Sequence, residues 1–137
     1  MLTTESQALR RAIKKNSDKM LYRFFEEGLT QKKLLIIRCG SCNTYHFPPR
    51  SFCPDCFNKE VELVEHLGKG KVYAFTSMAD KSSGGKSITY AMIDLEGVEG
   101  RIFTMVEAPY EEMFIGMGVE AGYLEKEGMV IPCFKPV

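Results

Sequence analysis

Four cysteines, Cys39, Cys42, Cys53 and Cys56, constrain the fold more than any other feature of this chain. They form two Cys-x-x-Cys turns separated by ten residues. Each turn can bring two thiolates to one metal ion, and two turns complete the tetrahedral four-sulfur shell that Zn²⁺ prefers. The spacer is shorter than in most zinc ribbons but suits a hairpin. Because four sulfurs leave no open position, we expect these cysteines to hold a structural zinc ion.

Other interpretations of the cysteines are weaker, but the identity of the metal ion stays open. Rubredoxin-like iron uses the same four-sulfur shell, so the sequence does not decide between zinc and iron. A disulfide framework is typical of small secreted domains, and we expect no secretory leader here. A single redox Cys-x-x-Cys would not need a duplicate. His46 lies between the two turns, but the shell is already complete, so we expect it not to bind the metal.

Charge divides the chain into two halves. The net charge is zero, yet residues 1–59 carry a balance of +6 and residues 60–137 a balance of −6. Four zinc-bound thiolates would lower the first value to about +4. The acidic half is a poor generic partner for nucleic acid, whereas the basic half could meet phosphate or an acidic protein surface. No apolar run approaches the ~20 residues of a membrane span, and reduced thiols indicate the cytoplasm.

The first segment has the pattern of two short helices. A capping-box sequence starts at Thr4, and Ser17 can cap a second helix. Phe24 and Phe25 recur at helical spacing in that second helix, and Gly28 is placed to end it. Two aromatic residues on so short a helix need a surface to cover. They pack either on the rest of this chain or on a partner subunit.

The pattern after the cysteines changes to that of strands. We expect a short strand at Leu34–Ile37, then a long first barrel strand from Val61 to Ser77 that bends at its glycines. The further expected strands are Ile88–Leu95, Arg101–Val106, Met117–Leu124 and Met129–Phe134, with a short helix at Pro109–Phe114. Three meandering strands, a helix and two more strands are the order of a five-stranded OB-fold barrel.

The predicted fold is therefore mainly β with N-terminal helices. Its parts are a helical hairpin over residues 1–30, a rubredoxin-like zinc ribbon over 31–60 and a C-terminal five-stranded OB-fold barrel over 61–137. By analogy of fold, a ribbon with an OB barrel often binds nucleic acid. Four aromatic residues could stack on bases, but their alternation along strands predicts that they fill the barrel. These residues are Tyr73, Phe75, Tyr90 and Phe103.

The sequence shows no catalytic machinery. Its two histidines, His46 and His66, have no Ser or Cys neighbour in the sequence suited to a triad. The run Gly84-Gly-Lys86-Ser87 has the tail of a phosphate-binding loop, but it lacks the upstream glycine and precedes a strand. We therefore expect an accessory or binding role rather than an enzyme.

Taken in order, several motifs resemble one family. They are the helical lead, the two Cys-x-x-Cys turns, Phe47-Pro-Pro-Arg50, Gly68-Lys-Gly70-x-Val72-Tyr73, Gly116-Met-Gly-Val119 and Ile131-Pro-Cys-Phe-Lys-Pro136. From about Tyr22 to its end, the chain is similar to the archaeal and bacterial zinc-ribbon/OB-fold proteins called domain of unknown function thirty-five, the acyl-CoA-associated group. Two positions depart from the usual knuckle. Asn43 and Phe57 stand where glycine is common, and Phe tolerates the left-handed conformation poorly.

The resemblance implies a non-catalytic scaffold or accessory subunit. Family members associate with thiolase-like or hydroxymethylglutaryl-CoA synthase-like enzymes, and others accompany hydratases or aldolases that act on acyl-CoA. Acyl-CoA is an implied ligand of such assemblies, because basic side chains can attract its phosphates. The candidates for CoA contact are Arg38, Arg50, Lys69 and Lys71. A single-stranded nucleic-acid binder is the leading alternative, and a stand-alone enzyme acting on CoA thioesters is a third.

Overall fold

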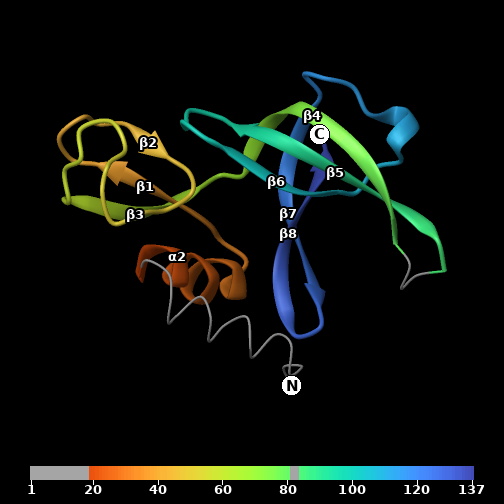
Figure 1. Ribbon diagram of the computed structural model, residues 1–137, viewed down its shortest axis with the longest axis horizontal. Helices are drawn as coiled ribbons and strands as arrows, with labels where there is room; N and C mark the ends of the chain where they lie inside the picture. Colours follow the sequence, from red (N-terminus) through yellow and green to blue (C-terminus); the bar gives the residue numbers. More distant parts are fainter. Residues whose placement is uncertain (1–18, 81–83) are drawn as a thin grey trace.

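The molecule is elongated, with a three-stranded ribbon sheet at one end and a closed barrel at the other (Figure 1). The computed structural model describes residues 19–80 and 84–137. A short helical segment lies beneath the ribbon sheet, on the side toward the barrel (Figure 1). The first predicted helix, which begins at Thr4, lies outside the described residues. Within the described ranges, no helix has both the length and the apolar composition that crossing a membrane requires.

The helical segment continues past the residue that was expected to end it. It consists of α2 (Lys19–Arg23), the π-helical turn η1 (Phe24–Gly28) and the 3-10 helix η2 (Leu29–Gln31). The prediction that Gly28 ends the helix is wrong, because the left-handed residue that follows the segment is Lys32, with φ 59°. Gly28 instead allows close packing on the ribbon. A Cβ there would lie 3.1 Å from the side chain of Leu35.

This segment packs on its own chain and touches both halves of the molecule. Phe24 is buried, and its ring meets that of Phe47 edge-on at 5.6 Å. η1 lies against the first ribbon strand, while η2 lies against β8 of the barrel. Packing within the chain, the first of the two possibilities left open for these aromatic residues, therefore holds for Phe24.

The ribbon sheet has the strand order β2-β1-β3. Its strands are β1 (Leu34–Cys39), β2 (Tyr45–His46) and β3 (Val61–His66). The expectation that Val61 begins the first barrel strand is wrong. β3 pairs antiparallel with β1 over six residues, from Leu34 opposite His66 to Cys39 opposite Val61. The chain enters the barrel only after Gly68, whose φ of 85° turns it out of the ribbon sheet. The domain boundaries proposed from the sequence remain predictions.

The barrel has the order β4-β5-β6-β8-β7 and is closed by pairing of β4 with β7. Its strands are β4 (Lys69–Asp80), β5 (Lys86–Leu95), β6 (Arg101–Val106), β7 (Gly118–Lys126) and β8 (Met129–Pro136). All pairs are antiparallel except β6 with β8. The 3-10 helix η4 (Tyr110–Glu112) lies between the third and fourth barrel strands. This arrangement confirms the predicted five-stranded OB-fold topology.

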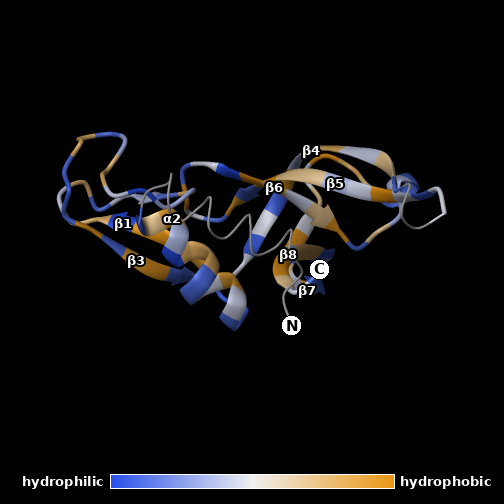
Figure 2. Ribbon diagram, turned by 60° about the horizontal axis from the view of Figure 1, so that its bottom comes forward, coloured by the Kyte–Doolittle hydropathy of each residue, from blue (hydrophilic) through white to orange (hydrophobic). Residues whose placement is uncertain are grey.

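The inward faces of the barrel strands form its core. Ile93, Val119 and Phe134 are fully or almost fully buried, and hydrophobic residues also run along β1 of the ribbon (Figure 2). The prediction that the aromatic residues fill the barrel is wrong for three of the four. Tyr73 is 48% exposed and Phe103 is 55% exposed, and Tyr90 stacks on Phe103 on the outer face of the barrel. A β-bulge between Val72 and Ala74 shifts the register of β4. Tyr73 follows the buried Val72 and lies outside the core, whereas the shift places Phe75 opposite the buried Ala91.

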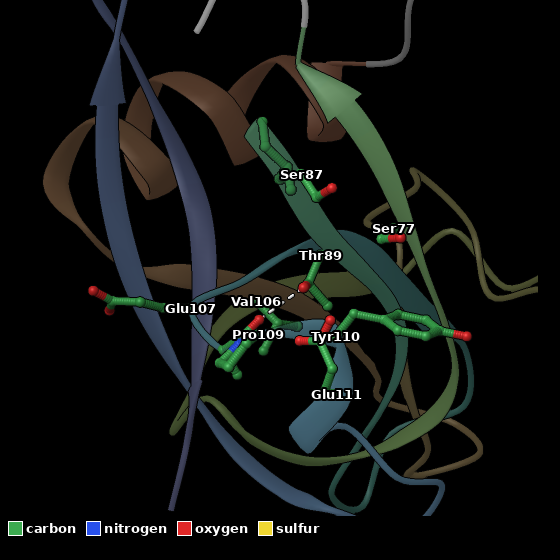
Figure 3. A pocket seen from close by; sticks show the side chains of 10 residues that line it. Ser77, Ser87, Thr89, Val106, Glu107, Pro109, Tyr110 and Glu111 are labelled. Atoms are coloured by element: carbon green, nitrogen blue, oxygen red, sulfur yellow. Dashed lines mark hydrogen bonds between the residues drawn. The ribbon is translucent and has the colours of Figure 1, made fainter. Parts of the chain in front are cut away.

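One end of the barrel, beside η4, carries a cavity of about 530 Å³ (Figure 3). Ser77 of β4 and Ser87 and Thr89 of β5 form one side of it. The segment from Glu107 to Glu111 forms the other side. Thr89 donates its hydroxyl hydrogen to the carbonyl oxygen of Ala108 at 2.7 Å, which holds the two sides together.

Candidate metal centre and ribbon–barrel junction

The two Cys-x-x-Cys turns fold into knuckles with the same backbone geometry. In the first, the N–H of Asn43 donates to the carbonyl oxygen of Cys39 at 2.9 Å. In the second, the N–H of Phe57 donates to that of Cys53 at 2.8 Å. Asn43 and Phe57 both take the left-handed conformation, with φ of 58° and 62°. Phe57 therefore departs from the usual residue type without departing from the knuckle geometry.

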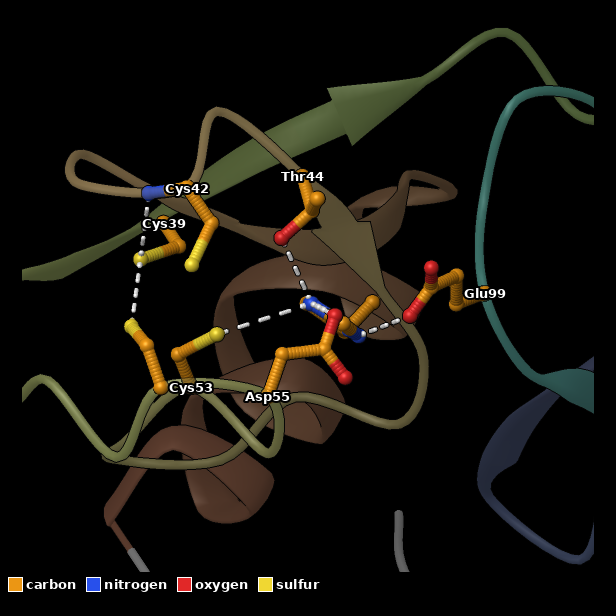
Figure 4. A network of polar contacts seen from close by, with 8 residues as sticks. Cys39, Cys42, Thr44, Cys53, Asp55 and Glu99 are labelled. Atoms are coloured by element: carbon orange, nitrogen blue, oxygen red, sulfur yellow. Dashed lines mark hydrogen bonds and ion pairs between the residues drawn. The ribbon is translucent and has the colours of Figure 1, made fainter.

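The four predicted metal-ligating sulfurs come together in space. All four Sγ atoms lie within 4.8 Å of one another, and those of Cys39 and Cys56 are 3.6 Å apart (Figure 4). Zn–S bonds of about 2.3 Å in a tetrahedron place sulfurs about 3.8 Å apart. The set therefore fits an ion of this size. Cys39 and Cys53 are buried, whereas Cys42 and Cys56 lie nearer the surface.

The acidity of the thiols also fits a cation site. The N–H of Cys42 points at Cys39 Sγ at 3.4 Å and is the main cause that lowers the pKa of Cys39 to about 7. Burial raises the pKa of Cys53, but the N–H groups of Cys56 and Asp55 outweigh it and leave a lowered value. A hydrogen bond between the thiol of Cys42 and the sulfur of Cys56 raises the pKa of Cys42 to about 12. A divalent cation would remove this conflict, because it favours the thiolate form of all four groups.

His46 lies beside the sulfurs and joins them to the barrel. Its Nε2 is 2.8 Å from the hydroxyl of Thr44 and 3.7 Å from Cys53 Sγ, and Asp55 Oδ2 is 3.6 Å away (Figure 4). Its Nδ1 is 3.4 Å from Oε2 of Glu99, in the β5–β6 turn. Sequence reasoning kept His46 off the metal but missed this bridging position. Its place between two cysteine turns was the only available signal.

The two carboxylates around His46 do not create a second metal site with it. One ligand atom from each of His46, Asp55 and Glu99 lies within 4.8 Å of the others. However, Asp55 faces Nε2 of the imidazole and Glu99 faces Nδ1. A single ion cannot bind both nitrogens of one ring, because their lone pairs point in different directions. The two carboxylates instead lie at ion-pair distance from opposite sides of the ring.

Thr44, His46 and Glu99 have the connectivity of a hydroxyl–imidazole–carboxylate triad. The expectation that His46 has no Ser or Cys neighbour suited to a triad did not consider threonine, and the hydroxyl beside the ring belongs to Thr44, two residues earlier in the sequence. Yet His46 is only 2% exposed, and neither Thr44 nor His46 lines the cavity beside η4. A triad needs a substrate within reach of its nucleophile. We therefore assign this group to the structure of the junction.

Backbone hydrogen bonds fix the ribbon to the barrel. The N–H of Phe47 donates to the carbonyl oxygen of Glu99, and the N–H of Glu99 donates to that of Tyr45, both at 2.9 Å. On the other side of the junction, His66 Nε2 lies 2.8 Å from the carbonyl oxygen of Glu96. The β5–β6 turn is thus held by ribbon strands on two sides. We expect ribbon and barrel to behave as one rigid body.

Two of the four basic residues predicted to contact CoA lie together. Lys69 and Lys71 line a cavity of about 510 Å³ at the start of β4. Arg38 is 3.3 Å from Glu62 and also bonds to Asn43. Neither Arg38 nor Arg50 lines this cavity or the one beside η4. The cavity that contains the lysines is also lined by Asp94 and Glu96, Gly70, Leu95, Gly118, Val119 and Val137.

Comparison with known proteins shows the family. Residues 27–62 match the model of the rubredoxin-like zinc ribbon domain of ChsH2. A DUF35 domain-containing scaffold protein of Methanocaldococcus jannaschii is 37% identical over 109 residues, which cover 76% of this chain and 77% of that protein. The chain belongs to the DUF35 family. This confirms the resemblance inferred from the motifs.

Other similar proteins carry the names of enzymes or enzyme subunits, two of which act on CoA thioesters by name. A probable enoyl-CoA hydratase alpha subunit of Thermomonospora curvata is 31% identical over 82% of this DUF35 chain, which spans only 36% of that relative. The benzoylsuccinyl-CoA thiolase subunit BbsA of Thauera aromatica is 36% identical over 51% of this chain and 49% of its own length. The solved structure named Ltp2-ChsH2(DUF35) aldolase matches 88% of this chain and 97% of its own, with 28% identity and a TM-score of 0.74.

Proposed function

We propose that this chain is a non-catalytic scaffold subunit that associates with a thiolase-like enzyme of acyl-CoA metabolism. The observation that carries the proposal is the similarity to the Methanocaldococcus jannaschii scaffold protein over three quarters of the chain. The names of the thiolase subunit and of the aldolase structure support an enzyme partner. A hydroxymethylglutaryl-CoA synthase-like partner stays a more specific form of the same proposal. We place the chain in the cytoplasm, on account of its reduced thiols.

The geometry supports a rigid body more than a catalyst. We propose that the four cysteines hold a structural zinc ion, which supplies a cross-link between the two knuckles. The closed sulfur shell leaves no position for a substrate. The N–H groups of the knuckles stabilise the thiolates, and His46 ties Cys53 to the barrel through Glu99. Such a body can present fixed surfaces to a partner.

Direct contact with CoA is a narrower proposal. Lys69 and Lys71 provide two cations beside one cavity, and ammonium groups attract phosphates. The carboxylates of Asp94 and Glu96 line the same cavity and oppose an anion there. Arg38 is already bound to Glu62. The structure therefore favours the two lysines over the two arginines as the residues that would meet CoA.

Affinity purification from the native host tests the scaffold proposal. The tagged chain should recover a thiolase-like enzyme, identified by mass spectrometry, in constant ratio over successive columns. The isolated, metal-loaded chain should show neither thiolase nor thioesterase turnover. Recovery of RNA and ribosomal proteins without any thiolase-like enzyme would refute the proposal, and turnover by the isolated chain would revive the enzyme alternative.

A single-stranded nucleic-acid binder remains the second candidate, because one observation favours it. Tyr90 and Phe103 stack at 5.6 Å between ring centroids on the outside of β5 and β6, and Arg101 lies 3.6 Å over the ring of Tyr73. Aromatic platforms of this kind bind unpaired bases. However, Arg101 is also bound to Asp94 at 2.7 Å. Titration with a labelled oligonucleotide at low and high salt decides, since phosphate contacts give a steep salt dependence.

A further inference from the structure

A rigid loop before β7 holds two large apolar side chains in the solvent. Phe114 is 58% exposed and Ile115 is 72% exposed. The residues on either side, Met113 and Met117, are buried. Two hydrogen bonds join this loop to Val72 of β4. The N–H of Gly116 donates to the carbonyl oxygen of Val72 at 2.8 Å, and the N–H of Val72 donates to the carbonyl oxygen of Met117 at 2.9 Å. The exposure therefore belongs to a fixed conformation, which we call the Phe114–Ile115 tip.

The cavity at the end of the barrel lies beside η4, and η4 immediately precedes the tip. One wall of this cavity is acidic. Glu111 lines it, and its carboxylate turns back toward Pro109 and Thr89 (Figure 3). Glu112 is exposed next to it. Among residues 19–80 and 84–137, neither glutamate forms an ion pair. Ile88 and Val106 add apolar surface to the same cavity.

This combination selects one kind of partner. A lysine or arginine places an aliphatic stem on apolar walls while its charged end meets a carboxylate, which is what the cavity offers. The tip adds a large aromatic and a branched side chain that would fill an apolar pocket, as interface hot spots do. We propose that the cavity and the Phe114–Ile115 tip together dock a basic, partly apolar surface of the thiolase-like partner enzyme.

The charge of this surface disfavours the other occupants. A second copy bound by the same face would bring Glu111 and Glu112 of both protomers against each other. Nucleic acid would bring phosphates to the same carboxylates. The thiolase-like enzyme is the occupant that these charges leave, and its contact surface must be basic to complement the two glutamates. This inference rests on the proposed function for the existence of such a partner.

Calorimetric titration with the thiolase-like enzyme purified from the native host tests the docking surface. Phe114→Ser should weaken binding about 10-fold or more. Glu111→Gln should weaken it by about threefold at low salt and reduce the salt dependence of the affinity. The matched control is Leu67→Ser, which changes a side chain that is 90% exposed on the linker between ribbon and barrel. It should bind as the unaltered chain does.

The outcomes separate the two proposals. If no thiolase-like enzyme binds the unaltered chain, the proposed function fails, and the docking surface fails with it. If the unaltered chain binds but Phe114→Ser binds equally well, only the docking surface is refuted. Self-association that Phe114→Ser abolishes would assign the tip to a second copy and also refute it. Each variant should have the zinc content and melting temperature of the unaltered chain. If a variant does not, Ile115→Ser is measured in its place.

Discussion

Gly100 should be the most sensitive glycine of the ribbon–barrel junction. A Cβ at this position would lie 2.0 Å from the carbonyl oxygen of Phe47 and 3.0 Å from its carbonyl carbon. Both are backbone atoms, so no side chain can rotate away. Gly100 also has a φ of 121°, which L-residues rarely adopt. Gly100→Ala should therefore force the β5–β6 turn away from β2.

The size of the effect follows from the contacts that would be lost. Restoring even a tight separation of about 3 Å requires a shift of about 1 Å, which breaks the two hydrogen bonds of 2.9 Å between Glu99 and the backbone of Tyr45 and Phe47. Each contributes about 1 kcal/mol net. Backbone strain adds about 1–3 kcal/mol. We expect Gly100→Ala to lower the free energy of unfolding by about 3–5 kcal/mol.

Urea unfolding followed by circular dichroism measures this loss, and Gly97→Ala is the matched control in the same turn. Gly97 also has a positive φ, of 74°, but a Cβ there would meet nothing within 4 Å. Gly97→Ala should lower the free energy of unfolding only by the cost of the backbone strain, about 1–2 kcal/mol. Equal losses for the two variants would show that the clash with Phe47 does not exist. The account of a rigid junction would then be wrong.

Three further results should follow from the site. Elemental analysis of the unaltered chain should find one zinc ion per chain, and iron or no metal would contradict the zinc assignment. Cys39→Ser should lose this zinc, whereas Cys133→Ser, which lies outside the sulfur cluster, should keep it. His46→Ala should lower the free energy of unfolding by about 1–3 kcal/mol. The variant should still bind one zinc ion when metal is in excess, because His46 contacts Cys53 Sγ rather than the ion. Loss of zinc from this variant would show that His46 is itself a metal ligand. If CoA binds this chain directly, Lys69→Gln with Lys71→Gln should weaken binding in calorimetry about 10-fold, and unchanged binding would exclude that cavity.

Much of the fold follows from local patterns. The cysteine spacing and the strand order were sufficient to predict the ribbon and the barrel, because paired Cys-x-x-Cys turns and alternating strands are signals that can be recognised within short segments. The end of the helix could not be predicted in this way. Gly28 has a negative φ, and its lack of a side chain serves close packing on Leu35, 7 residues further along. Likewise, pairing of β3 with β1 depends on contacts between distant segments. Alternating residues from Val61 to Ser77 fit either sheet.

The surroundings of the metal site were less predictable than its ligands. Nothing in the local sequence shows that Glu99, more than fifty residues after His46, returns to its ring. Tyr73 and Phe75 share a face in a regular strand, but the bulge between Val72 and Ala74 puts them on opposite faces of β4. Tyr90 and Phe103 lie between buried neighbours on β5 and β6 and therefore face outward without any bulge. Phe114 lies in a loop, where no alternation of residues indicates which side chains are exposed.

The central claim is that this chain serves an acyl-CoA enzyme as a zinc-stabilised scaffold. Native mass spectrometry of the complex purified through a tag on this chain tests it most directly. We predict one assembly that contains this chain, one zinc ion for each copy of it and a thiolase-like enzyme. A chain that carries its zinc but is recovered only by itself or with nucleic acid would contradict the claim.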